Sequence, residues 1–67
     1  MIPSVNVART MLRIIGRKHL RPMINSSSFE DAEEMVECYI EDNPRVRKWM
    51  NTAGYDITSY VYKLKYE

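Results

Sequence analysis

The chain has 67 residues, enough for one domain, and ten basic and nine acidic side chains give it a net charge of +1. Its 45% hydrophobic and 28% charged residues are typical of a globular protein. One cysteine and one histidine exclude a disulfide framework and a structural zinc site. With no apolar run of roughly 20 residues and no signal-peptide core, we expect a single cytoplasmic domain over 1–67, without cofactor or metal.

The charges are sorted along the chain into three blocks. Residues 1–28 carry five basic and no acidic side chains, and residues 29–42 carry seven acidic and no basic ones. Residues 43–67 have a net charge of +3. Such blocks either neutralise one another within the fold or face outward as patches of opposite sign. The simpler interpretation is that most of them neutralise one another.

The first 25 residues allow two interpretations. Wound at 100° per residue, seven apolar residues from Val5 to Ile15 share half of a helical wheel, which predicts an amphipathic helix over 4–17. Alternatively, residues 10–15 and 18–24 are two strands joined by a two-residue turn at Gly16 and Arg17.

The clearest element is a helix over about 28–42. A serine followed three residues later by an acid is a capping box, formed here by Ser27 with Glu30 or by Ser28 with Asp31. The apolar residues that then share one helical face are Phe29, Ala32, Met35, Val36, Tyr39 and Ile40.

A second helix is predicted over about 44–53. Proline suits the first position of a helix, and Asn43 before it is a typical capping residue. Gly54 is suited to the end of the helix because it tolerates a left-handed backbone. The apolar residues at helical spacing are Val46, Trp49, Met50 and Ala53.

The tail over about 57–66 is predicted to be a strand. It is rich in Tyr, Val, Thr and Ile and alternates with a period of two. A helix would instead place Ile57, Tyr60, Val61 and Leu64 on one face. A lone strand leaves its backbone groups unpaired, so it needs a partner strand from the N-terminal segment. We therefore predict an α+β fold, two consecutive helices on a short antiparallel sheet, with an all-α fold carrying the helix 4–17 as the alternative.

The sequence offers no catalytic constellation. The single histidine, His19, and the single thiol, Cys38, lie nineteen positions apart on different predicted elements. A nucleophilic pair needs both groups within hydrogen-bond reach and a third group to orient them. We expect Cys38 to be partly buried, His19 to be solvated, and the protein not to be an enzyme.

Three sets of residues are candidates for binding. The acidic helix face is the first candidate for a protein partner, and it consists of Glu30, Glu33, Glu34, Glu37 and Glu41. The basic residues that would contact nucleic acid or an acidic partner are Arg9, Arg13, Arg17, Lys18 and Arg21. The aromatic residues that would anchor a partner are Tyr60, Tyr62 and Tyr66.

These features favour a small, non-enzymatic protein-protein interaction module. In size and layout, with strands around an acidic helix, the chain resembles small phage-encoded proteins that bind and inhibit host machinery. That resemblance implies an inhibitor or modulator, of phage or plasmid type, that acts on a larger protein. The alternative is a small nucleic-acid-binding protein that uses the basic N-terminal segment. An exposed strand edge would also allow homodimerisation.

Overall fold

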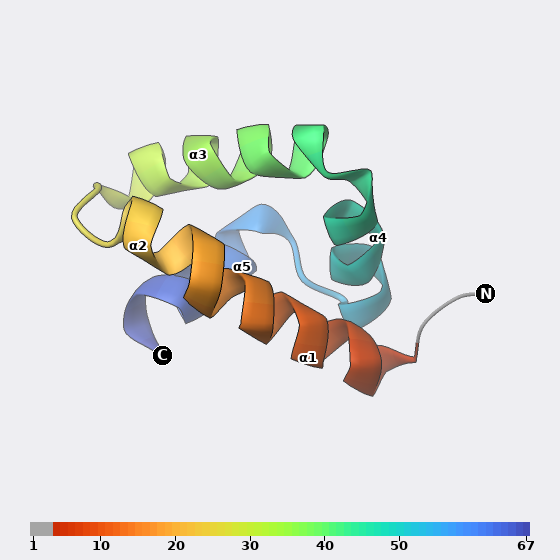
Figure 1. The fold of residues 1–67 in the computed structure, drawn as a ribbon. Helices are drawn as coiled ribbons and strands as arrows, with labels where there is room; N and C mark the ends of the chain where they lie inside the picture. Colours follow the sequence, from red (N-terminus) through yellow and green to blue (C-terminus); the bar gives the residue numbers. More distant parts are fainter. Residues whose placement is uncertain (1–3) are drawn as a thin grey trace.

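The computed structural model describes residues 4–67, and within that range it contains four helical segments and no strand (Figure 1). Of these residues, 84% are helical. The first segment is a long rod in which a π-helical turn, η1, joins two α-helices. The elements in chain order are α1 (Val5–Ile15), η1 (Gly16–Leu20), α2 (Arg21–Ile24), α3 (Phe29–Asp42), α4 (Pro44–Ala53) and α5 (Ile57–Tyr66).

The predicted α+β fold is wrong, and the all-α alternative matches the structure. The residues expected to form strands at 10–15 and 18–24 belong to one helical rod, without a turn at Gly16. The rod begins at Ser4, whose Oγ accepts a hydrogen bond from the Val7 N–H at 3.2 Å. The helix forms because it satisfies the backbone locally and buries Ala8 and Leu12. Val5, Val7 and Ile14 of the predicted apolar face remain exposed. The layout on which the resemblance to phage proteins rested is therefore absent from residues 4–67.

The tail is the helix α5 rather than a strand. Asp56 caps it by accepting a hydrogen bond from the Ser59 N–H at 2.7 Å, and this bond lowers the pKa of the Asp56 carboxyl. The side chains of Tyr60, Val61 and Leu64 are buried on one face. Burial of this face outweighs the β-propensity of the individual residues, which depends strongly on context. Homodimerisation through a strand edge has no basis in the described residues.

The two middle helices are confirmed. Ser28 caps α3, with its Oγ accepting from the Asp31 N–H at 3.2 Å. Gly54 ends α4 in a left-handed conformation with φ of 78°. Asn43 stands at the start of α4, but its side chain does not cap that helix. Its Nδ2 donates instead to the carbonyl oxygen of Tyr39 at 2.9 Å, which ends α3.

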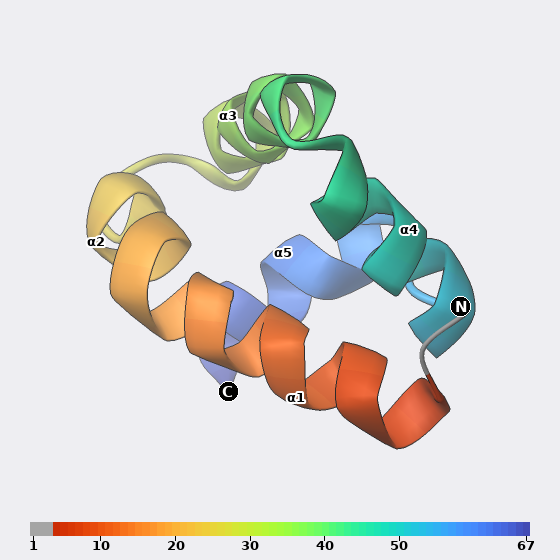
Figure 2. The same ribbon diagram turned by 45° about the vertical axis from the view of Figure 1, so that its right-hand side comes forward.

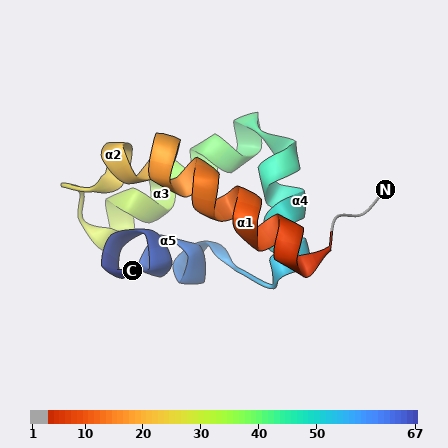
Figure 3. The ribbon, with the colours of Figure 1, turned by 60° about the horizontal axis from the view of Figure 1, so that its bottom comes forward.

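The helices surround one core. The rod lies on one side of the molecule and α3 on the opposite side, with α5 between them and α4 closing one end (Figures 1 and 2). The helix α1 packs on α4, while η1 and α2 contact α5. Figure 3 shows α5 beside the part of the rod that includes α2. The C-terminal helix therefore holds the rod and α3 together.

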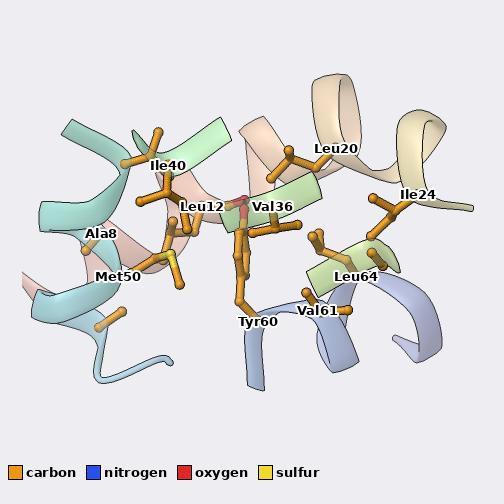
Figure 4. Close-up of a cluster of buried hydrophobic side chains, with 13 residues drawn as sticks. Ala8, Leu12, Leu20, Ile24, Val36, Ile40, Met50, Tyr60, Val61 and Leu64 are labelled. Atoms are coloured by element: carbon orange, nitrogen blue, oxygen red, sulfur yellow. Dashed lines mark hydrogen bonds between the residues drawn. The ribbon is translucent and has the colours of Figure 1, made fainter. Parts of the chain in front are cut away.

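Tyr60 stands at the centre of this core and ties α5 to α1 (Figure 4). Its side chain is 2% exposed, and its hydroxyl donates a hydrogen bond to the Leu12 carbonyl oxygen at 2.6 Å. The hydroxyl is thereby satisfied in an otherwise apolar environment. The core side chains are Ala8, Leu12, Leu20, Ile24, Ala32, Val36, Ile40, Val46, Met50, Ala53, Tyr60, Val61 and Leu64.

The π-helical turn follows from Pro22. A proline inside a helix lacks an N–H and collides with the carbonyl four residues earlier, which here belongs to Lys18. The rod widens at this point, and the Arg21 N–H bonds to the carbonyl oxygen of Gly16, five residues back. The wider turn keeps the chain helical past the proline instead of ending the rod.

Gly16 lets α5 approach the rod closely. It is buried, and a Cβ added there would overlap the Leu64 side chain and lie 3.2 Å from the Tyr60 Oη. Two basic side chains, Arg21 and Lys65, also form hydrogen bonds between the rod and α5. The Arg21 Nε donates to the Leu64 carbonyl at 2.9 Å. The Lys65 Nζ donates to the carbonyl of Ile24 at the end of the rod and to that of Ser27 in the connection to α3. Each helix thus satisfies terminal carbonyls of the other.

We expect Gly16→Ala to destabilise the protein although alanine is the better helix former. Overpacking a core costs about 1–3 kcal/mol, against a gain in helix propensity of about 1 kcal/mol. In a Leu64→Val background the overlap is relieved, and the cost of Gly16→Ala should fall by about 1 kcal/mol. Urea unfolding of the wild type, the two single variants and the double variant measures the interaction energy between positions 16 and 64. Additive effects would contradict the close contact.

Burial raises the pKa of the Tyr60 hydroxyl above its ordinary value of 10.0. Folded Tyr60 therefore keeps its proton at pH values where the unfolded chain releases it. The stability that this provides is complete below pH 10 and is lost as the pH rises toward the folded pKa.

Tyr60→Phe should lower the free energy of unfolding by about 0.5–1.5 kcal/mol at neutral pH. Above pH 10 the free energy of unfolding of the wild type should fall, relative to that of the variant, by up to about 1.4 kcal/mol per pH unit. Unfolding curves recorded from pH 7 to 11 test this, with the exposed Tyr62→Phe as control. If the difference in free energy of unfolding between the wild type and Tyr60→Phe did not change with pH, this would contradict the burial of the hydroxyl.

Candidate functional site

The strongest candidate is a groove between the rod and α5, with a volume of about 270 Å³. We call it the arginine groove. Its floor consists of Leu12, Tyr60 and Leu64, and Tyr55 and Glu67 lie at its edges. The basic residues that line it are Arg9, Arg13, Arg17 and Arg21 from the rod and Lys63 from α5.

The π-helical turn brings the arginines into line. In an α-helix, four residues turn through about 400°, so positions four apart drift by about 40° at each step. Arg21 would then point about 120° away from Arg9. Within η1 a full turn takes more residues, so the step from Arg17 to Arg21 falls short of a full turn and offsets the drift. All four side chains therefore line one groove.

The basic residues of the groove differ in whether they already have a hydrogen-bond or ion-pair partner within the protein. Arg9, Arg13 and Arg17 are exposed, and none of them has a carboxylate within 4.0 Å in the part of the chain that is described. Arg21 is half-buried and bonded to the Leu64 carbonyl. Lys63 lies 5.5 Å from the centroid of the Tyr55 ring.

One carboxylate approaches the groove. The Lys63 Nζ is 3.5 Å from the Glu67 Oε1, the only ion pair among residues 4–67. Both side chains are partly exposed, so this pair is weak and easily exchanged. The floor is uncharged at neutral pH, because a tyrosine hydroxyl ordinarily has a pKa of 10.0 and burial raises the pKa of Tyr60 further. The groove therefore has a positive potential with a partly apolar base.

Four of the five predicted basic residues line the groove. Lys18 is exposed on η1 and is not one of the lining residues. The sequence does not indicate Lys63 as a groove residue when the tail is predicted to be a strand, and Tyr55 lies in the connection between α4 and α5, where no periodicity marks it. Read as a helix, the tail places Lys63 at i+3 from Tyr60, close to the buried face, which is the signal that could have found it.

The acidic helix face is exposed on α3, away from the arginine groove. Glu30, Glu34, Glu37 and Glu41 are exposed, and Glu33 is half-buried and accepts a hydrogen bond from the Thr58 Oγ1 at 2.7 Å. Within residues 4–67, no basic side chain lies within 4.0 Å of these glutamates. Within the described residues, the expected neutralisation of the charged blocks therefore does not occur through ion pairs with this face.

The predicted aromatic anchors separate into two groups. Tyr60 is a core residue and cannot contact a partner. Tyr62 and Tyr66 are exposed on α5, with ring centroids 5.1 Å apart and ring planes tilted by 55°. They are neighbours on one helical face, as their spacing of four residues requires.

The two reactive side chains lie apart. His19 is exposed on η1, and Cys38 is exposed on α3 rather than partly buried as predicted. Cys38 is exposed because it lies at the border of the apolar face of α3, outside the row formed by Ala32, Val36 and Ile40. Among residues 4–67, no three His, Cys, Asp or Glu side chains are grouped as metal ligands would be.

Within the described range, none of the helices combines the length and the hydrophobicity needed to cross a bilayer. Comparison of the chain with protein-family models, with curated proteins and with solved structures found no match.

Proposed function

We propose that the protein is a non-enzymatic interaction module whose arginine groove binds an acidic segment of a larger protein. The observation that carries this proposal is the convergence of four arginines and a lysine, from two helices, on one groove with a single carboxylate at its edge. The binding would modulate the partner, and we place it in the cytoplasm, where the one free cysteine would stay reduced.

The groove suits carboxylates for two reasons. The guanidinium group forms paired hydrogen bonds with a carboxylate, and arginine is among the residues that contribute most binding energy at interfaces. The half-buried ring of Tyr55, which also lines the groove, offers apolar contact beside the charges. A protein segment supplies both carboxylates and apolar side chains, so it matches both parts of the groove.

The spacing of the arginines also suits a protein helix. Residues four apart on an α-helix are separated by about 6 Å along the axis. Arg9, Arg13 and Arg17 therefore form a row with the same repeat as carboxylates at every fourth position of an acidic helix. A helix lying along the rod can place each carboxylate opposite one arginine.

A nucleic acid fits the same surface less well. Proteins that bind DNA strongly through its backbone make about 6–10 phosphate contacts. Here Arg21 and Lys63 already have partners, which leaves three unengaged arginines in the groove. The net charge of +1 and the exposed glutamates of α3 give little further attraction to a polyanion. Three contacts favour a short acidic segment over a long phosphate backbone.

The proposal can be tested with a labelled helical peptide that carries glutamate at every fourth position, and with a peptide carrying glutamine there instead. We expect the acidic peptide to bind, and Arg13→Glu/Arg17→Glu to weaken its affinity by at least about tenfold, or about 1.4 kcal/mol. Fluorescence anisotropy measures the affinities.

The matched control is Arg47→Glu/Lys48→Glu, which makes the same change in charge on exposed residues of α4 outside the groove. We expect it to weaken binding by less than about threefold. Equal losses in the two variants would indicate attraction to net charge alone and would contradict the proposal. Tighter binding of duplex DNA or single-stranded RNA than of the peptide, with a steep dependence on salt, would favour the nucleic-acid alternative.

A further inference from the structure

A second groove lies along α3 and is distinct from the arginine groove. It has a volume of about 490 Å³, and it is lined by Met23 from α2 and by Met35, Cys38 and Tyr39 from α3. Three carboxylates stand around it, those of Asp31, Glu34 and Asp42. We call it the methionine groove.

The floor of this groove holds apolar side chains that the rest of residues 4–67 leaves partly uncovered. Met23 is 43% exposed and Met35 is 36% exposed, although Met35 belongs to the apolar stripe that the sequence assigned to the core. The Ser27 Oγ donates a hydrogen bond to the Met35 Sδ at 3.6 Å, which holds that side chain beside the connection between α2 and α3. Methionine adapts to the shape of a partner and is used at surfaces that bind helices.

An adjoining hollow of about 300 Å³ continues the groove toward α4. The two share Tyr39 and Asp42, and the hollow adds the apolar Ile15, Val46 and Trp49 and the basic Arg45. Tyr39 and Trp49 are half-buried, so each offers part of its ring to a partner while the rest is fixed by the core. Aromatic side chains held in this way are typical anchors at interfaces.

The charged side chains that line the methionine groove itself are all acidic, whereas Arg45 lines the adjoining hollow. No lysine or arginine of residues 4–67 lies within 4.0 Å of the carboxylates of Asp31, Glu34 or Asp42. Three unpaired carboxylates beside an apolar floor complement a ligand that is apolar in the middle and basic at its flanks. Lysine and arginine side chains can extend from a buried stem to place their charges at such a rim.

We propose that the methionine groove binds a basic amphipathic helix of a partner protein. The apolar face of that helix would lie on Met23, Met35 and Tyr39, and its lysine and arginine side chains would reach the carboxylates at the rim. The groove follows α3, whose 14 residues extend over about 21 Å. This second site is independent of the arginine groove.

The experiment uses a synthetic peptide of about 14 residues in which leucine at helical spacing forms one face and lysine forms the other. A scrambled peptide of the same composition is the control ligand. Trp49 is the only tryptophan of the chain and lines the adjoining hollow, so its emission reports binding directly. We expect saturable binding of the amphipathic peptide and at least about tenfold weaker binding of the scrambled one.

Two single variants locate the site on the protein. Glu34→Lys reverses a charge at the rim, and Met35→Ser removes an apolar contact without adding charge. Each should weaken binding of the amphipathic peptide by at least about fivefold. Glu37→Lys makes the same charge reversal on the same helix outside the groove and should change the affinity by less than about twofold.

Three outcomes would overturn the proposal. They are equal effects of Glu34→Lys and Glu37→Lys, equal affinity for the scrambled peptide, and no change in Trp49 emission up to about 1 mM peptide. Arg13→Glu/Arg17→Glu should leave this binding intact, which separates the methionine groove from the arginine groove.

Discussion

The close contact between α5 and the rod at Gly16 is the constraint on which the rest of the structure depends. Because Gly16 has no side chain, Leu64 packs directly on the rod, and the Tyr60 hydroxyl reaches the Leu12 carbonyl. Arg21 and Lys65 then satisfy carbonyls across the same contact. A chain of 67 residues buries only about 60% of its unfolded surface, so the loss of a junction between helices distant in sequence is not easily compensated elsewhere.

The same contact builds the arginine groove. Its one wall is the rod, its other wall is α5, and its floor is made of the residues that join them. The π-helical turn that Pro22 imposes also sets the direction of Arg17 and Arg21, so a backbone irregularity and a charged surface have one cause. π-helical turns occur frequently at functional sites. The acidic rim of the methionine groove lies on α3, and the protein thus presents two surfaces of opposite charge.

The sequence was sufficient where local signals decided the structure. Ser28 with Asp31, Pro44 and Gly54 marked the ends of α3 and α4 correctly, because capping and backbone preference act within one turn. It was misleading for the tail, where tyrosine, valine and threonine suggested a strand although Asp56 stood in a capping position. Tertiary burial of Tyr60, Val61 and Leu64 decided that segment, and no local pattern reveals the surface on which they pack. The basic residues were named correctly as a set, but their alignment depended on η1, and Lys63 could not be added without α5.

The claim that the groove, rather than net charge, recognises an acidic segment is tested most directly by two adjacent residues. Arg17 lines the groove, whereas Lys18 is exposed and does not line it. The affinities of Arg17→Gln and Lys18→Gln for the acidic helical peptide, measured by calorimetry, compare two variants with the same loss of charge. The account predicts a loss of at least about fivefold for Arg17→Gln and almost none for Lys18→Gln. Equal losses in the two variants would contradict it.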